Sequence, residues 1–301
     1  MTIKKKVVVL YGGRSAERAV SLESGKNVHA ALLKRGYNSK LCDVTENFCA
    51  AITFLADEKP EAVFNALHGG DGEGGHWQSV LDMMKIPYTH SGANASMLGM
   101  DKVLSKMLFK QAGIPMAKYK IVSRESILEK DPMQRPYVIK PKNEGSSIGV
   151  QILIAQKDVI EPFKYDEMIV EEFIAGQEIH VAVLRGEVLG MIEILPKASF
   201  FYDYKSKYQS GGSEHIVPKD LKKEVRADLE KYALKAHNIL GCRGVSRVDF
   251  KYDSETGQMA ILEVNTQPGM TNMSLVPDIA KQKGMSYEDV VEEILKDAAF
   301  D

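Results

Sequence analysis

The sequence predicts a mixed fold, α/β in its first third and α+β in the remainder. In the first hundred residues, short apolar runs alternate with helical segments, an order typical of a parallel sheet with helices on its faces. From residue 168 onward, apolar runs follow one another through tight Gly-containing turns, as in an antiparallel meander. With 301 residues, the chain is long enough for two or three domains.

The composition is that of an ordinary globular protein and makes several classes improbable. Hydrophobic residues make up 44% and charged residues 27% of the chain, and the net charge is −2, so we expect neither nucleic-acid nor membrane binding. The three cysteines are scattered, which fits a reducing cytoplasm and offers no metal-ligand spacing. The apolar run 7–10 is too short for a signal peptide, and no run approaches the roughly 18 apolar residues of a membrane span.

Three strands are predicted in the N-terminal region, at residues 7–10, 37–44 and 61–67. A helical run from about residue 21 to residue 35 joins the first two. Gly-rich loops follow the first and third strands, at the carboxyl ends where α/β sheets bind ligands. The pair Gly12-Gly13 is not a GxGxxG fingerprint, so dinucleotide binding is not favoured.

Two polar residues lie at the mouth of this predicted sheet. Glu17 follows the first strand and could meet a ligand ammonium, or could simply complement the dipole of the helix that begins there. His68 follows the third strand, and a lone histidine in such a place is more often a hydrogen-bonded structural residue than a catalyst. The residues alone leave both alternatives open.

The middle of the chain carries a pattern suited to phosphate binding. Asp101 caps a helix that runs to residue 111, and Lys102 lies in its first turn. The strand 136–141 carries Lys140 and is followed by the Gly/Ser loop 142–149 and another strand. Backbone N–H groups and hydroxyls of such a loop can donate to phosphate oxygens while a lysine neutralises charge. A plain hairpin loop is the alternative, because no Walker A sequence is present.

An antiparallel meander follows, with strands expected at residues 168–174, 178–184 and 188–194. Glu171 and Glu178 flank its first turn. Residues 196–218 are then expected to form a long loop, and loops of this length are commonly lids or disordered segments. The aromatic residues in the loop favour a lid.

Three helices are expected in the C-terminal third. A long helix spans residues 219–240 and ends at a glycine, and shorter ones begin at residue 274 and span residues 286–298. Ser274 could cap its helix or contact a ligand, and the residues alone do not separate these roles.

The chain is organised around a predicted hairpin over residues 245–271. If the turn 253–257 is centred on Thr256, then Arg247 faces Asn265 and Asp249 faces Glu263. All four have odd numbers, so their side chains share one face of the ribbon.

Two opposed carboxylates repel each other unless a cation lies between them. Carboxylate and amide oxygens suit Mg²⁺, which in proteins usually also holds substrate phosphates. Arg247 would then be a fixed cation beside the metal, and Gly269 in the following loop could bring backbone N–H groups close to a ligand. The alternative is a solvated hairpin face with one salt bridge, which contributes little.

Taken together and in this order, the sequence motifs resemble those of the D-alanine–D-alanine ligase family of ATP-grasp enzymes. The resemblance covers essentially the whole chain and is carried by residues 12–21, 66–69, 100–102, 138–141, 144–149, 201–208, 247–249 and 263–271. It implies a Rossmann-like N-terminal domain at residues 1–98, followed by a two-part ATP-grasp domain. The parts would be a central small subdomain at 99–178 and a C-terminal subdomain at 179–301, which holds the lid loop 196–218 and the metal site.

The resemblance also implies an activity. ATP phosphorylates one D-alanine, and the amine of a second attacks the resulting D-alanyl phosphate to give D-alanyl-D-alanine for peptidoglycan synthesis. The enzyme would work in the cytoplasm, as a homodimer, with two Mg²⁺ ions or with Mn²⁺ as an alternative ion.

The resemblance assigns roles residue by residue. Glu17 would bind the ammonium of the first D-alanine and link through Ser146 to Tyr208 of the lid. His68 would support this first site, and Ser274 would hold the carboxylate of the second D-alanine.

The remaining roles concern ATP and the metal ions. The lysines that would contact ATP phosphates are Lys102, Lys140 and Lys207, and the residues that would hold adenine and ribose are Glu171, Ile174 and Glu178. The metal ligands would be Asp249, Glu263 and Asn265, with Glu263 bridging the two ions. Arg247 and the Gly269 N–H would stabilise the tetrahedral oxyanion.

The sequence departs from the family pattern at two places. Position 74 is glycine where family members often have aspartate, and position 177 is glutamine where they often have arginine. The rival functions are a D-alanyl-D-lactate ligase, against which Tyr208 argues, and a non-catalytic nucleotide-binding regulator, against which the intact metal residues argue. A nicotinamide oxidoreductase is more distant, because GxGxxG is missing.

Overall fold

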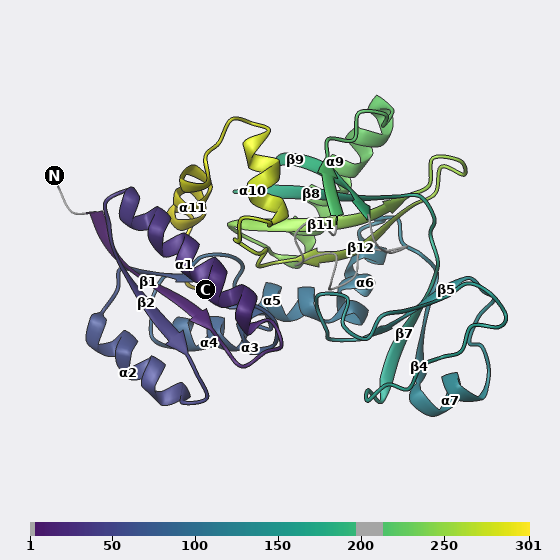
Figure 1. Ribbon diagram of the computed structural model, residues 1–301, viewed down its shortest axis with the longest axis horizontal. Coiled ribbons are helices and arrows are strands. Elements are labelled where there is room, and N and C mark those ends of the chain that lie inside the picture. Colours follow the sequence, from purple (N-terminus) through teal and green to yellow (C-terminus); the bar gives the residue numbers. More distant parts are fainter. Residues whose placement is uncertain (1–3, 197–212) are drawn as a thin grey trace.

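The computed structural model describes residues 4–196 and 213–301. Within this part of the chain there are three sheets, with helices packed against them (Figure 1). The N-terminal sheet is parallel, with strand order β2-β1-β3. The two others are antiparallel, with orders β4-β7-β5-β6 and β10-β9-β8-β11-β12. The predicted order, a parallel α/β region followed by an α+β remainder, is therefore confirmed.

The N-terminal sheet is covered on both faces. Its strands are β1 (Lys4–Gly12), β2 (Tyr37–Val44) and β3 (Ala62–Asn65). Its helices are α1 (Arg18–Lys34), α2 (Phe48–Glu58), α3 (Gly70–Glu73) and α4 (His76–Met83). Val7 and Val9 pack in the same core as α1, whereas Val8 and Leu10 pack in the core that contains α2 and α4. Because both faces are buried, the strand is apolar throughout rather than alternating.

Two helices lead from this region to the small antiparallel sheet, namely α5 (Ala93–Met100) and α6 (Lys102–Gln111). The sheet contains β4 (Tyr119–Ser123), β5 (Tyr137–Pro141), β6 (Gln151–Leu153) and β7 (Glu167–Glu172), with helix α7 (Arg124–Glu129) beside them. As predicted, a strand lies on each side of the Gly/Ser loop, and these strands, β5 and β6, pair antiparallel.

The large antiparallel sheet carries helices on both faces. Its strands are β8 (Gln177–Leu184), β9 (Glu187–Pro196), β10 (Ser213–Ile216), β11 (Val245–Tyr252) and β12 (Met259–Asn265). The helices are α9 (Lys223–Leu240), α10 (Leu275–Lys281) and α11 (Tyr287–Lys296). On β8, Val181 and Val183 share a core with α9, whereas Ala182 shares one with α10 and with strand β1. Neighbouring residues of β8 therefore point to opposite faces of the large sheet, and the face that carries Ala182 packs against the N-terminal region.

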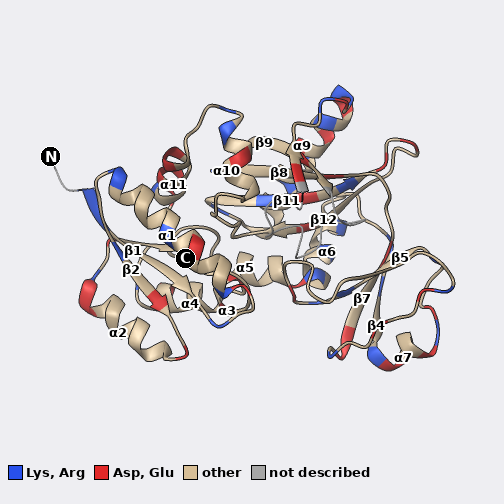
Figure 2. Ribbon diagram, viewed as in Figure 1, with Lys and Arg blue, Asp and Glu red and all other residues tan. Residues whose placement is uncertain are grey.

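The C-terminal segment also binds the N-terminal region through charges. Acidic residues of α11 lie against basic residues of α1 and β1 (Figure 2). The pairs are Glu292 with Lys4, Glu288 with Lys34, and Asp289 with Arg35. Beyond the helix, Ala299 pairs with Tyr88, which itself pairs with Val63 of β3. The two ends of the described chain therefore lie in one packed unit.

Several predicted boundaries need correction. Part of the expected loop 196–218 is a strand, because Ser213–Ile216 form β10 and pair with the end of β9. The sequence Ser-Glu-His-Ile has little strand character of its own, and pairing with the edge of β9 decides its conformation. The helix expected from residue 219 begins at Lys223. Elements α2, α5, β4 and α7 were not predicted, since their segments lack a clear hydrophobic period.

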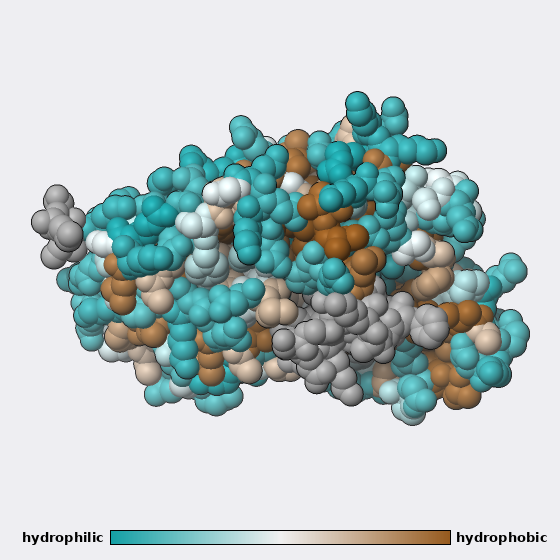
Figure 3. All heavy atoms as spheres, turned by 45° about the horizontal axis from the view of Figure 1, so that its top comes forward, coloured by the Kyte–Doolittle hydropathy of each residue, from teal (hydrophilic) through white to brown (hydrophobic). Residues whose placement is uncertain are grey.

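Among residues 4–196 and 213–301, every helix is too short or too polar to cross a lipid bilayer. The face drawn in Figure 3 is mainly hydrophilic, and its apolar side chains gather in a few separate areas.

Candidate active site

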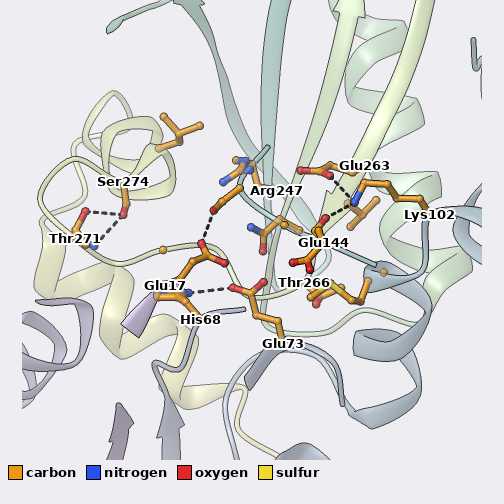
Figure 4. Close-up of a pocket in the computed structure, with 18 of the residues that line it drawn as sticks. Glu17, His68, Glu73, Lys102, Glu144, Arg247, Glu263, Thr266, Thr271 and Ser274 are labelled. Atoms are coloured by element: carbon orange, nitrogen blue, oxygen red, sulfur yellow. Dashed lines mark hydrogen bonds and ion pairs between the residues drawn. The ribbon is translucent and has the colours of Figure 1, made fainter. Parts of the chain in front are cut away.

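Two cavities meet at the hairpin formed by β11 and β12. The first lies between this hairpin and the loops of the N-terminal sheet (Figure 4), and its lining includes Glu17 and Arg247. The second is lined from both antiparallel sheets. Lys102, Glu144 and Glu263 line both cavities, so the two spaces adjoin at these side chains.

The hairpin has the predicted register. Arg247 pairs with Asn265, and Asp249 pairs with Glu263. The register shifts by one residue directly after Asp249, where a bulge begins. The four polar residues therefore lie on the same side of the irregularity, away from the turn, and the pairing that places them on one face of the ribbon is intact.

Asp249 is almost fully buried, and its carboxylate is bound by Arg247 and His180. Arg247 donates from Nε and Nη2 to its two oxygens, at 2.7 and 2.8 Å. His180 on β8 lies with Nδ1 2.7 Å from the Asp249 Oδ1. Burial raises the pKa of Asp249, but the charges of Arg247 and His180 outweigh it and hold the pKa well below its usual range. The carboxylate is thus kept ionised inside the protein.

His180 was not predicted as a site residue. It lies on β8 opposite Asp249, and its Nε2 is 3.4 Å from Glu178. Its place in the sequence, between the apolar strand residues Ile179 and Val181, could have indicated a buried position. Both neighbours are fully buried in the structure. A buried histidine on a strand needs a polar partner, and here the partner is a proposed metal ligand.

The donor set at the hairpin fits Mg²⁺ in its chemistry. Asp249, Glu263 and Asn265 offer only oxygen ligands, which Mg²⁺ prefers. The Asp249 carboxylate has about four lone-pair sites and still keeps one of them after accepting hydrogen bonds from Arg247 Nε, Arg247 Nη2 and His180 Nδ1. Among residues 4–196 and 213–301, no three His, Cys, Asp or Glu side chains converge as a metal site. An ion held here would therefore need the Asn265 amide and oxygens of a substrate, as is usual for Mg²⁺ with phosphates.

Lys102 connects three segments at the junction of the cavities (Figure 4). It is the first residue of α6, whose N-cap is Asp101, as predicted. Its Nζ donates to the Glu144 carbonyl at 2.5 Å and lies 3.7 Å from the Glu263 Oε2. The ammonium is thus placed beside the proposed metal ligand, where a phosphate would carry negative charge.

A buried lysine–carboxylate–lysine arrangement forms one wall of the second cavity. The Oε2 of Glu171 accepts from Lys140 at 2.8 Å, and its Oε1 lies 2.9 Å from the Nζ of Lys106. Burial raises the pKa of Glu171, but the charges of Lys140 and Lys106 outweigh it and lower the pKa to about 2. Lys106 was not predicted as a site residue, because a lysine four positions after Lys102 resembles an ordinary surface lysine of a helix.

The remaining residues predicted for adenine and ribose also line the second cavity. Ile174 is buried there, with Val138 and Ile152 as apolar neighbours in the lining. Glu178 lies at its edge, 3.5 Å from the Lys251 ammonium. The cavity thus combines an apolar surface for a flat ring with charged groups around it.

Glu17 makes a long-range contact in the first cavity. Its carboxylate accepts a hydrogen bond from Ser146, 129 residues away in the chain. Although Glu17 occupies the N-cap position of α1, its side chain makes no capping bond. Ser146 and Ser147 have φ of 50° and 59°, a strained left-handed conformation that non-glycine residues seldom adopt. The alternative of a simple helix-dipole charge is therefore insufficient for Glu17.

His68 is buried and ties the first cavity to the loop after the hairpin. Its Nδ1 lies 3.1 Å from Glu73 and its Nε2 lies 3.1 Å from the hydroxyl of Ser24. That hydroxyl also accepts from the Met270 N–H at 3.2 Å. The histidine is hydrogen-bonded, in line with its structural alternative, and it also lines the cavity.

Gly269 and Ser274 approach each other at the far side of this cavity. A Cβ added to Gly269 would lie 2.9 Å from the Ser274 hydroxyl, so only glycine fits there without a shift. Ser274 occupies the N-cap position of α10 but makes no side-chain capping bond. Its hydroxyl accepts instead from the Thr271 N–H at 2.9 Å. Ser274 also lines the cavity, as a ligand contact requires.

A buried amide cluster was also not predicted. Gln267, just beyond the hairpin, accepts from Asn65 of β3 at 3.0 Å and from Gln78 of α4 at 3.2 Å. Its backbone N–H donates to the Asn265 side chain at 2.9 Å. The cluster fixes a proposed metal ligand to the N-terminal region, over a sequence distance that local patterns do not reveal.

Comparison with known proteins decides the family. A family model described as D-ala D-ala ligase C-terminus matches residues 108–296. D-alanine–D-alanine ligases of Erythrobacter litoralis and Bartonella bacilliformis are 46% and 47% identical to this chain. The alignments cover 98% of this chain in both cases, and 94% and 98% of the relatives. The chain belongs to the D-alanine–D-alanine ligase family.

Solved structures agree with this assignment. A D-alanine–D-alanine ligase from Bacillus anthracis is 29% identical and superposes with a TM-score of 0.81, covering 98% of this chain and 97% of that one. The same ligase in complex with ATP gives 28% identity and a TM-score of 0.80. The predicted family, fold class and enzymatic character are therefore confirmed.

The structure gives reasons for the two departures from the pattern of the D-alanine–D-alanine ligases. A Cβ at Gly74 would lie 2.8 Å from the Gly70 carbonyl oxygen, so the local turn leaves no room for a side chain. Gln177 donates to Glu193 on β9 at 2.8 Å and therefore points along the large sheet. The remaining predicted site residues, Lys207 and Tyr208, lie outside the described residues.

Proposed function

We propose that this protein is an ATP-dependent ligase that joins two molecules of D-alanine through a D-alanyl phosphate, supplying D-alanyl-D-alanine for peptidoglycan synthesis. The adjoining cavities carry this proposal. A nucleotide in the second cavity would direct its terminal phosphate toward Lys102, Glu144 and Glu263, which also line the first cavity. A carboxylate bound in the first cavity would meet the phosphate there.

The first step is transfer of the terminal phosphoryl group. An oxygen of the substrate carboxylate attacks the γ-phosphorus while the bond to ADP breaks. Such a step requires positioning and charge neutralisation rather than covalent help from the protein. We assign this to Lys102 and Lys140. Mg²⁺ held by Asp249, Glu263 and Asn265 would neutralise charge on the phosphates.

The second step is attack of an amine on the acyl phosphate. The amine of the second D-alanine adds to the carbonyl carbon, and phosphate leaves from the tetrahedral intermediate. Arg247 and the Gly269 N–H line the first cavity and are assigned to the developing oxyanion, where preorganised donors act most strongly. The Asp249 carboxylate holds Arg247 in place with two hydrogen bonds.

Substrate binding is assigned to the walls of the first cavity. Glu17 would pair with the ammonium of the first D-alanine, and His68 would support this site. Ser274 would hold the carboxylate of the second D-alanine. In the second cavity, Glu171, Ile174 and Glu178 would hold adenine and ribose.

Further assignments rest on the family resemblance. Lys207 would reach the transferred phosphate and Tyr208 would link to Ser146, closing a lid. We further propose a homodimer formed through the N-terminal region, a cytoplasmic location, and domain boundaries near residues 98 and 178.

The test is ADP release from ATP in the presence of Mg²⁺ and one candidate substrate at a time. We expect release with D-alanine, little with L-alanine, and D-alanyl-D-alanine as product. Omission of D-alanine should abolish release, which distinguishes an enzyme from a nucleotide-binding regulator. Faster incorporation of D-lactate than of D-alanine as second substrate would contradict the proposal and favour a depsipeptide ligase.

A further inference from the structure

Lys106 is a completely buried lysine that the proposed mechanism does not use. It lies one turn after Lys102 on α6, and its side chain is only 1% exposed. Lysine is almost never fully buried unless it is paired, and its partner here is Glu171 on β7 at 2.9 Å. The ammonium also lies 5.5 Å from the centre of the Tyr119 ring, on the neighbouring strand.

Glu171 stands between Lys106 and the second cavity. Its other oxygen binds Lys140 at 2.8 Å, and both Glu171 and Lys140 line the cavity. Among the described residues, the lining does not include Lys106. Lys106 therefore lies behind Glu171, whereas Glu171 and Lys140 both border the ligand space. Lys106 can act on a ligand only through the other two side chains.

The shared carboxylate divides its negative charge between two ammonium groups. If Lys140 were the only partner, the two charges would form a one-to-one pair and largely cancel toward the cavity. With Lys106 bound to the opposite oxygen, the Lys140 ammonium keeps a net attraction for an anion. A phosphate is such an anion, and charge-assisted hydrogen bonds to it are among the strong ones.

We propose that Lys106 is a positioning residue for ATP: it binds the rear oxygen of Glu171 and thereby leaves the Lys140 ammonium available to the phosphates. The inference rests on the proposed function, because it takes ATP as the ligand of the second cavity. The competing explanation is purely structural, in which Lys106 only compensates a buried carboxylate between α6 and β7. The two explanations differ in which part of the nucleotide binds more weakly when Lys106 is replaced.

The test compares Lys106→Met with Lys106→Gln and with the control Lys110→Met. Met removes the ammonium, Gln keeps a neutral donor, and Lys110 is an exposed lysine on the same helix. Binding of ATP and of adenosine is measured by calorimetry, and folding is checked by thermal unfolding. We expect ATP affinity to fall by about tenfold in both Lys106 variants, with a clearly smaller loss for adenosine, which lacks the phosphates, and no change in the Lys110 variant.

A second experiment tests whether Lys106 acts on ATP through Lys140. In a Lys140→Met background, Lys106→Met should change ATP affinity by less than about twofold, because the intermediary is already absent. In turnover assays, the KM for ATP should rise while the KM for D-alanine stays unchanged.

The possible outcomes separate the hypotheses. Unchanged ATP affinity in every folded Lys106 variant would overturn the inference, and so would equal losses for ATP and adenosine, which indicate a structural role. A full tenfold loss in the Lys140→Met background would also overturn it. Failure of the wild-type protein to bind ATP would instead overturn the proposed function.

Discussion

The two cavities are built in different ways. The first takes its key side chains from loops of the N-terminal sheet, the loop 142–149 and the hairpin exit, which are far apart in sequence. The second is lined mainly by neighbouring strands and loops of the two antiparallel sheets. The first therefore depends on how distant segments come together, and the second on the packing of regular elements.

The charged groups of the two cavities are also held in different ways. In the first cavity, Glu17 is held by Ser146 across 129 residues, from a loop with strained backbone. In the second, Glu171 lies on a strand between two lysines on neighbouring elements. Loop-held groups can rearrange with a ligand, whereas strand-held groups are fixed before it binds. We therefore expect substitutions in one cavity to leave binding in the other intact, except at their junction.

The largest effect should come from that junction. Glu263→Gln keeps the shape of a side chain that lines both cavities but removes its charge. We expect kcat for ADP release to fall by about a thousandfold, because charge stabilisation at the phosphoryl group is lost. The control is Glu255→Gln, on the exposed turn of the same hairpin. Turnover within tenfold of the wild-type value would refute the metal assignment.

A smaller effect, confined to the first cavity, is expected from Glu17→Gln. The amide can still accept the hydrogen bond from Ser146, but it cannot pair with a substrate ammonium. We expect kcat/KM for D-alanine to fall by about a hundredfold, as for loss of a buried charge pair. ATP affinity should stay within twofold.

The control for this prediction is Glu23→Gln, an exposed residue of the same helix α1. It should leave kinetics unchanged. If Glu17→Gln weakened ATP binding as much as D-alanine use, the two cavities would not be separable in the way the comparison requires.

The sequence predicted features that depend on nearby residues better than contacts between distant segments. The pairs Arg247–Asn265 and Asp249–Glu263 were predicted from parity and a turn centred on Thr256, but the bulge after Asp249, which shifts the register next to the turn, was not. The parallel sheet was predictable from apolar runs alone. Local patterns are informative wherever pairing partners are close in sequence.

The partners of buried charges were not predictable. The contacts of Lys106 with Glu171 and of His180 with Asp249 form across elements 65 and 69 positions apart, and they depend on packing rather than on a pattern. The contact of Glu17 with Ser146 was reached only through the family resemblance. The segments that became α2 and α5 had no distinctive period, so tertiary contacts decided their conformation.

The smallest expected effect is on stability and belongs to the second cavity. The pKa of Glu171 is about 2 in the folded protein, against an ordinary value of 4.5. Because the folded-state pKa is the lower one, the ionised carboxylate stabilises the fold above pH 4.5, and this stabilisation is lost as the pH falls from 4.5 toward 2. Between pH 7 and pH 3 the loss is on the order of 2 kcal/mol.

Glu171→Gln removes this titration, so its free energy of unfolding should fall less between pH 7 and pH 3 than that of the wild type. Denaturant unfolding at the two pH values measures the difference, and Glu167→Gln, an exposed residue at the start of the same strand, is the matched control. The control should keep the wild-type pH dependence, because its carboxylate makes no buried pair. An equal pH dependence in Glu171→Gln and the wild type would mean that the two lysines do not hold this carboxylate ionised. The charges of the second cavity would then not be fixed before a ligand binds, and the comparison with the first cavity would fail on this point.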